Sequence, residues 1–140
     1  MFTIDQSSGF GQRTLRHLAE DSVVWLTTSR TGGAPQPSPV WFLWQDGSLL
    51  VYSQPDTPKL RNIAANPRVS LNFNCTSQGG DVVVMTGTAE ILGDAPPASQ
   101  VADYIAKYER GIDQLGSTPE RFASMYSVAV RVTPTSVRGH

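Results

Sequence analysis

The chain has 140 residues, the usual length of one domain, so we expect residues 1–140 to fold as a single unit. Its 11 Lys and Arg residues and 12 Asp and Glu residues give a net charge of -1, which argues against general binding to nucleic acid or to anionic membranes. The single cysteine excludes an intrachain disulfide. Because neither a signal peptide nor an apolar stretch of roughly 20 residues is present, we expect a cytoplasmic protein.

The first third of the chain predicts one helix and two strands. Apolar residues at helical spacing predict an amphipathic helix over 8–20, and the β-branched and aromatic run 23–28 predicts a strand that ends at a glycine-rich turn. Residues 36–44 predict the second strand. Since Pro37 and Pro39 lack N–H groups on the same side, this strand is expected at an edge or a bulge of the sheet.

The middle of the chain continues this pattern. An Asp-Gly turn leads into the third strand, 49–53, and a short helix over 58–65 follows. Residues 69–74 and 82–92 predict the fourth and fifth strands, and Gly87 indicates a bend or a close backbone approach in the latter.

The last part of the chain predicts a helix over 98–108, a short helix that opens at Thr118, and a sixth strand over 126–132. Six strands joined by tight turns and short helices favour a mainly β fold. We expect a closed or nearly closed antiparallel barrel with peripheral helices, because a flat sheet would leave long edges exposed.

The sequence gives little support for catalysis by the protein's own side chains. His17 and His140 have no His, Cys or carboxylate companions at metal-ligand spacing, and glycine-rich nucleotide loops and a nucleophile elbow are missing. We therefore predict no catalytic side chain and no metal site. If the protein is an enzyme, a bound cofactor does the difficult chemistry.

Two cations occupy positions that a helix disfavours. Lys59 and Arg61 lie in the first turn of helix 58–65, where the helix dipole disfavours each cation by roughly 0.3–1 kcal/mol. A phosphate held by free backbone N–H groups, the Thr57 hydroxyl and these cations would explain them, with Lys59 as the better candidate. The alternative is an ordinary basic surface helix, which tolerates an effect of this size.

The segment VWFLW, residues 40–44, is apolar on both faces. On a strand, residues 40, 42 and 44 face one way and residues 41 and 43 the other, although a small barrel has one interior to fill. The outer set needs a cover. Either a helix supplies it, or a partner subunit does, with or without a flat aromatic cofactor.

The order of these segments resembles that of a known family. A strand with TT, a glycine turn, QPSPVWFLW, a DG turn, LLVYS, TPKLRNIAANPRVSL and a later GTAEIL resemble the pyridoxamine 5′-phosphate oxidase-like family with the FMN-binding split-barrel fold. The resemblance covers about residues 12–92, and the C-terminal RVTPTSVRG also fits. It implies a homodimer of six-stranded antiparallel split β-barrels of Greek-key type, with two cofactor sites at the subunit interface.

The resemblance also implies a cofactor and the residues around it. FMN members often begin the short helix with Ser-Arg-Lys, where this chain has Thr-Pro-Lys, and they often carry an arginine near the position of Val40. Both differences disfavour FMN, and K-L-R-N followed by NPR resembles the actinobacterial branch that uses the deazaflavin F-420, which also carries a phosphate. Carried over by position, the cofactor-binding residues are Gln36, Val40 and Trp41 beside the ring, Tyr52 and Ser53 below it, and Thr57, Lys59 and Asn62 toward the phosphate.

Three functions follow from this reading. The first is an oxidoreductase in which F-420 transfers hydride to an unsaturated organic substrate. The second is an FMN-dependent oxidase or reductase on the same scaffold, and the third is a non-catalytic carrier of a flavin or deazaflavin. None of the three involves a nucleic acid or a membrane.

Overall fold

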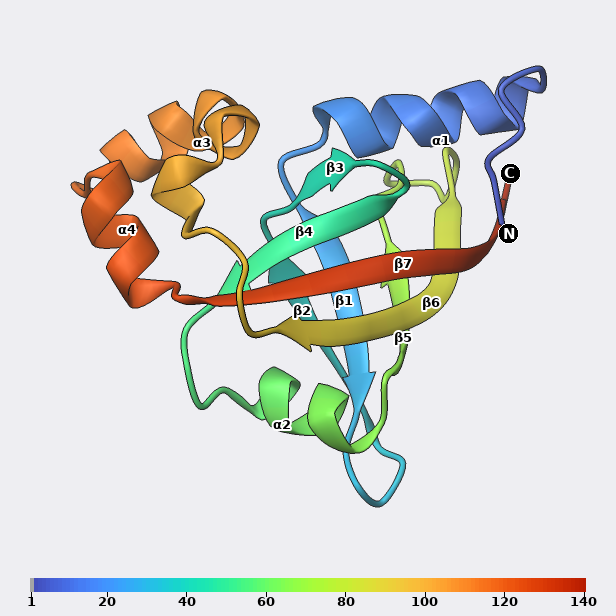
Figure 1. The fold of residues 1–140 in the computed structure, drawn as a ribbon. Coiled ribbons are helices and arrows are strands. Elements are labelled where there is room, and N and C mark those ends of the chain that lie inside the picture. The colour runs from blue at the N-terminus through green and yellow to red at the C-terminus, as the bar shows by residue number, and fades with distance from the viewer. Residues whose placement is uncertain (1) are drawn as a thin grey trace.

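The computed structural model describes residues 2–140, which form one curled antiparallel sheet with helices around it (Figure 1). The strands of these residues are β1 (Val24–Ser29), β2 (Pro35–Val40), β3 (Leu43–Gln45), β4 (Ser48–Ser53), β5 (Arg68–Asn72), β6 (Val83–Leu92) and β7 (Val128–Gly139). The helices are α1 (Gly9–Glu20), α2 (Pro58–Ala65), η1 (Ala98–Gln100), α3 (Ala102–Gln114) and α4 (Pro119–Met125). The predicted mainly β fold with peripheral helices is confirmed.

The sheet is split at residues Trp41 and Phe42, where the chain turns a corner between β2 and β3. Its strand order is β2-β1-β5-β6-β7-β4-β3, so the two edges, β2 and β3, are consecutive in the sequence. The predicted strand 36–44 breaks at Trp41 and Phe42, where the chain crosses from one edge to the other. This break is why the described residues form seven strands rather than the predicted six. Within the sheet, β4 to β7 lie in the Greek-key order β5-β6-β7-β4.

Side chains of α3 stabilise this corner. The Phe42 N–H donates to the Tyr108 hydroxyl at 2.8 Å, and the Lys107 ammonium donates to the Phe42 carbonyl at 2.8 Å. Both backbone groups of Phe42 are therefore satisfied without a strand partner. The prolines of β2 fit its position at an edge, because Pro37 and Pro39 pair with β1 on one side only.

The barrel interior is one apolar cluster that α1 and α2 close from opposite ends (Figure 1). Its buried residues are Leu18, Val24, Leu26, Phe42, Leu49, Val51, Leu60, Ile63, Val69, Leu71, Phe73, Val83, Met85, Ala89, Val130 and Val132. The predicted bend in β6 is also confirmed. The pairing with β7 shifts register between Thr86 and Gly87, and a Cβ on Gly87 would lie 2.5 Å from the Thr133 carbonyl oxygen.

A second apolar cluster lies on the outer face of the strands, beneath α3 and α4. The predicted alternation of residues 40–44 holds across the corner, since Phe42 joins the barrel interior while Trp41 and Leu43 join the outer cluster. The Trp41 ring stacks on Tyr108 with centroids 4.5 Å apart and on Phe122 at 5.5 Å. Helices therefore cover this face, which is the first of the two alternatives that the sequence left open.

Close packing of α3 on the corner depends on a glycine. A Cβ on Gly111 would lie 2.9 Å from Cη2 of Trp41, so the indole and the helix approach closely only because no side chain intervenes. α3 also extends further than predicted, and a short 3₁₀ turn, η1, precedes it. No helix within residues 2–140 combines the length and the apolar character needed to cross a bilayer.

Candidate functional site

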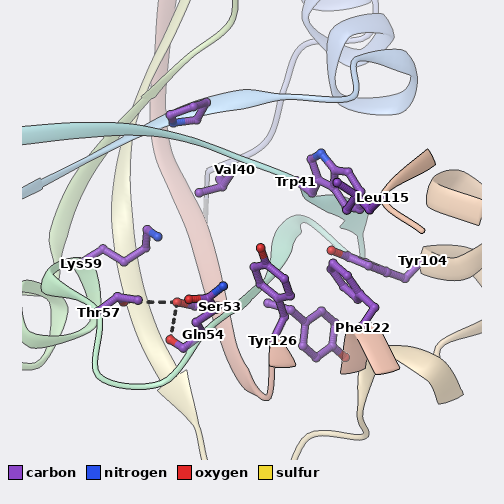
Figure 2. A pocket seen from close by; sticks show the side chains of 12 residues that line it. Val40, Trp41, Ser53, Gln54, Thr57, Lys59, Tyr104, Leu115, Phe122 and Tyr126 are labelled. Atoms are coloured by element: carbon purple, nitrogen blue, oxygen red, sulfur yellow. Dashed lines mark hydrogen bonds between the residues drawn. The ribbon is translucent and has the colours of Figure 1, made fainter. Parts of the chain in front are cut away.

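A cavity of about 360 Å³ lies between the start of α2 and the pair α3–α4 (Figure 2). Six of the eight residues that the family resemblance pointed to line it: Val40, Trp41, Tyr52, Ser53, Thr57 and Lys59. They come from the end of β2, the corner, the end of β4 and the start of α2. The geometry therefore brings together side chains that lie up to 19 positions apart in the sequence, from 40 to 59.

Gln36 and Asn62 are not among the lining residues, and they bind each other instead. The Asn62 amide donates to Oε1 of Gln36 at 2.9 Å and to Oγ1 of Thr28 at 3.0 Å. Asn62 is only 8% exposed. Its amide ties α2 to β1 and β2, which holds the start of α2 in place beside the cavity.

The start of α2 leaves polar groups available at the cavity wall. Thr57 is the N-cap residue, but its side chain makes no capping hydrogen bond, and its Oγ1 lies 3.2 Å from Oγ of Ser53. Pro58 occupies the first helical position and has no N–H. The two hydroxyls thus lie together where a helix N-terminus favours an anion.

Lys59 is a half-buried cation at the same end of the cavity. Burial lowers the pKa of its ammonium, and among residues 2–140 no carboxylate forms an ion pair with it. In Figure 2 its side chain reaches along the cavity wall with the ammonium directed toward the interior. An anion in the cavity would offset the unfavourable burial of this charge.

Arg61, the second cation of the predicted cluster, has a different environment. It is exposed, its guanidinium donates to the Asp56 carbonyl at 2.8 Å, and it does not line the cavity. The two cations of the helix start therefore separate, and only Lys59 faces the cavity.

The opposite side of the cavity is aromatic. The Phe122 ring stacks on Trp41 at 5.5 Å and on Tyr126 at 4.5 Å, with interplanar angles of 20° and 16°. Tyr104, from α3, completes this wall, and Leu115 lies beside it with 64% of its surface exposed. Figure 2 shows Tyr104 across the cavity from Lys59.

This aromatic wall is not predicted by the sequence. No motif in the sequence connects Tyr104, Phe122 or Tyr126 with a site. These residues lie more than 40 positions beyond Lys59, on elements whose docking no local pattern reveals. The one feature of the sequence that could have pointed to this wall is its tyrosines, because a tyrosine combines an apolar ring with a hydroxyl that needs a hydrogen-bond partner when it is buried.

Known structures share the fold of this chain. An F-420 reductase is 27% identical over 86% of this chain and 92% of its own, with a TM-score of 0.65. An FAD-binding protein from Mesorhizobium loti is 22% identical, with 90% of this chain and 88% of its own covered and a TM-score of 0.64. The General Stress Protein 26 of Bacillus anthracis is 20% identical, with 90% and 89% covered and a TM-score of 0.67.

No curated protein sequence matches the chain. A family-level comparison is more informative, because the sequence model described as pyridoxamine 5′-phosphate oxidase matches residues 10–140. That match spans the barrel, the cavity and the helices that enclose it. The chain therefore belongs to the pyridoxamine 5′-phosphate oxidase family.

Proposed function

We propose that the protein is an oxidoreductase that binds the deazaflavin F-420 in the cavity between Lys59 and the aromatic wall. The observation that carries this proposal is a half-buried ammonium without an anionic partner in residues 2–140, placed at one end of a cavity whose other end is aromatic. Similarity to an F-420 reductase at 27% identity supports the choice of cofactor.

The residues present fit a planar molecule with a phosphate. Lys59 supplies a positive charge, and the Thr57 hydroxyl can supply a hydrogen-bond donor beside it, whereas the Ser53 hydroxyl donates to the Gln54 carbonyl at 2.8 Å. The exposed parts of Trp41 and Tyr126 provide apolar aromatic contact for a conjugated ring. The volume of about 360 Å³ lies within the range of roughly 300–1,000 Å³ for small-molecule sites.

The protein's own contribution is binding and orientation. When bound, F-420 supplies hydride transfer to an unsaturated organic substrate. Lys59 and Thr57 would hold the phosphate, while the partly exposed Trp41 and Tyr126 would contact the ring and exclude water from one side. Leu115, exposed at the cavity, would contact an incoming substrate.

We further propose that two copies of the chain pair, as the family resemblance implies. Ile91, Leu115 and Met125 are large apolar residues with 43%, 64% and 52% of their surface exposed. A partner surface would bury such residues. Light scattering after size-exclusion chromatography should give the mass of a dimer, and a monomer at micromolar concentration would contradict the pairing.

Fluorescence titration with F-420 and with FMN tests the choice of cofactor. We expect saturable binding of both, with F-420 tighter, because Pro58 replaces the arginine that would grip the FMN phosphate with two hydrogen bonds. Saturable FMN binding without F-420 binding would reverse this order and favour an FMN-dependent oxidase or reductase.

Turnover separates an enzyme from a carrier. Reduced F-420 with a panel of enones, quinones and tetrapyrroles should be reoxidised faster with the protein than without it for at least one compound. Tight cofactor binding with no acceleration for any of them would favour a carrier.

A further inference from the structure

Three tyrosines of the outer cluster differ in what their hydroxyls bind. Tyr104 packs against Tyr52 at 5.1 Å and against Tyr108 at 4.9 Å between ring centroids. The Tyr52 hydroxyl donates to the Pro96 carbonyl at 2.7 Å, and the Tyr108 hydroxyl accepts from Phe42. The Tyr104 hydroxyl has no hydrogen-bond partner among residues 2–140.

This unpartnered hydroxyl is fully enclosed. Tyr104 is 0% exposed, and its ring is held between its aromatic neighbours, so a ligand in the cavity contacts the hydroxyl only when the side chains beside it in the cavity wall shift. Leaving a buried hydroxyl without a partner costs roughly 1–3 kcal/mol. A phenylalanine would fill the same space without this penalty, so the hydroxyl makes no favourable contribution to folding.

The hydroxyl points into the candidate site. Tyr104 lines the cavity, and Figure 2 shows its oxygen directed toward the space that Lys59 enters from the other side. Burial raises the pKa of this phenol, so it keeps its proton at neutral pH and can donate a hydrogen bond. The polar groups of the cavity thus comprise a cation and hydroxyls at one end and the phenols of Tyr104 and Tyr126 at the other, of which only Tyr104 is fully buried.

We propose that the Tyr104 hydroxyl determines ligand specificity by donating a hydrogen bond to the ring of the bound molecule. The ligand class is a planar heteroaromatic ring with a carbonyl oxygen or an unprotonated ring nitrogen at the end remote from its phosphate. This assignment rests on the proposed function, because it takes the same cavity as the cofactor site. The ligand would satisfy a donor that the folded chain alone leaves unpaired.

Tyr104→Phe tests the assignment in the full chain. The probes are F-420 and FMN, each beside its counterpart that lacks the phosphate. We expect Tyr104→Phe to weaken both members of a pair about tenfold, the effect of one hydrogen bond. Lys59→Ala should weaken only the member that carries phosphate. The absorption band of the bound ring should also shift between wild type and Tyr104→Phe.

Thermal unfolding without ligand provides a second readout. Tyr104→Phe should keep or raise the melting temperature, whereas Tyr108→Phe, which leaves the Phe42 N–H without its acceptor, should lower it. A lower melting temperature for Tyr104→Phe would reveal a structural partner and overturn the assignment.

These experiments distinguish failure of the role assigned to Tyr104 from failure of the proposed cofactor site. Equal affinity of wild type and Tyr104→Phe for a probe that Lys59→Ala binds more weakly would overturn the role of Tyr104 and leave the cofactor site intact. Absence of binding by wild type to every probe would overturn the proposed function itself, and the assignment with it.

Discussion

The two apolar clusters of this protein lie on opposite faces of the same strands and are built differently. The core of the barrel interior is an apolar cluster, and the buried polar residues Thr28 and Asn62 hydrogen-bond each other beside it. The outer cluster contains Tyr52, Tyr104 and Tyr108, and it borders the cavity. We infer that the barrel interior mainly provides stability and that the outer face provides the proposed ligand site, because a face with hydroxyls at defined positions can recognise a ligand.

Two half-buried lysines differ in a similar way, one having a structural role and the other having no partner in the chain. Lys107 has its pKa lowered by burial to about 8, but its ammonium donates to the Phe42 carbonyl and lies 3.7 Å from the centroid of the Phe42 ring. Lys59 is desolvated as well, yet it has no such partner among residues 2–140. The first lysine stabilises the corner of the sheet, and the second is available to a ligand.

Met85→Ala in the barrel interior should have the largest effect. Met85 is 0% exposed, and its truncation should lower the free energy of unfolding by about 2–5 kcal/mol because it leaves a cavity. Urea denaturation measures this loss. Gln54→Ala is the control on the cavity side, where an exposed side chain limits the expected change to about 0.5 kcal/mol. Equal losses would remove the distinction between the two faces.

Lys59→Ala should weaken cofactor affinity by about 1–3 kcal/mol, the range for a hydrogen bond to a charged group, and barely change stability. Titration of F-420 or FMN gives the dissociation constant. Arg61→Ala is the matched control, since it removes the same charge from the same helix start but does not line the cavity. Equal weakening by both variants would mean that general electrostatic attraction, and not the cavity, holds the phosphate.

Tyr52→Phe tests a tyrosine of the outer cluster whose hydroxyl, unlike that of Tyr104, has a partner within the chain. It removes the hydrogen bond to the Pro96 carbonyl, so the free energy of unfolding should fall by about 0.5–1.5 kcal/mol. Denaturant unfolding of the unliganded protein measures it. An unchanged stability would indicate that water replaces the hydroxyl at Pro96.

The smallest expected effect is a pH dependence at the end of the barrel that α1 closes. His17 hydrogen-bonds Asp21 at 2.7 Å and Asp81 at 2.9 Å, and Arg13 also pairs with Asp81. Burial alone would lower the pKa of His17, but these carboxylates outweigh it and raise the pKa above its ordinary 6.5.

The sign of this pH effect follows from the raised pKa. Protonated His17 is favoured in the folded state, so its contribution is complete below pH 6.5 and is lost as pH rises through the folded pKa. The free energy of unfolding should decline over that range in wild type and decline less in His17→Gln. Identical pH profiles for the two proteins would contradict the role of His17.

Local patterns in the sequence predicted much of the fold. The helix 58–65 has the predicted bounds because Pro58 and Pro67 mark its ends, and the alternation of residues 40–44 holds because strand geometry imposes it. The break in the second strand was not predictable locally. It depends on Lys107 and Tyr108, side chains from a helix more than 60 positions away.

Some residues of the candidate site could also be identified from the sequence, and others could not. Lys59 and Thr57 could be found because two cations at a helix start conflict with the helix dipole. Tyr104 could not be distinguished from Tyr108 by spacing, since both are buried at helical intervals on α3. Only the three-dimensional arrangement shows that one hydroxyl binds the backbone while the other faces the cavity.

A crystal structure of the protein soaked with F-420, and with FMN in parallel, tests the central claim most directly. We predict the phosphate within hydrogen-bond distance of the Lys59 ammonium, the ring against Trp41, and an acceptor atom of the ring at the Tyr104 hydroxyl. A cofactor bound elsewhere, with Lys59 in contact with water alone, would contradict the account.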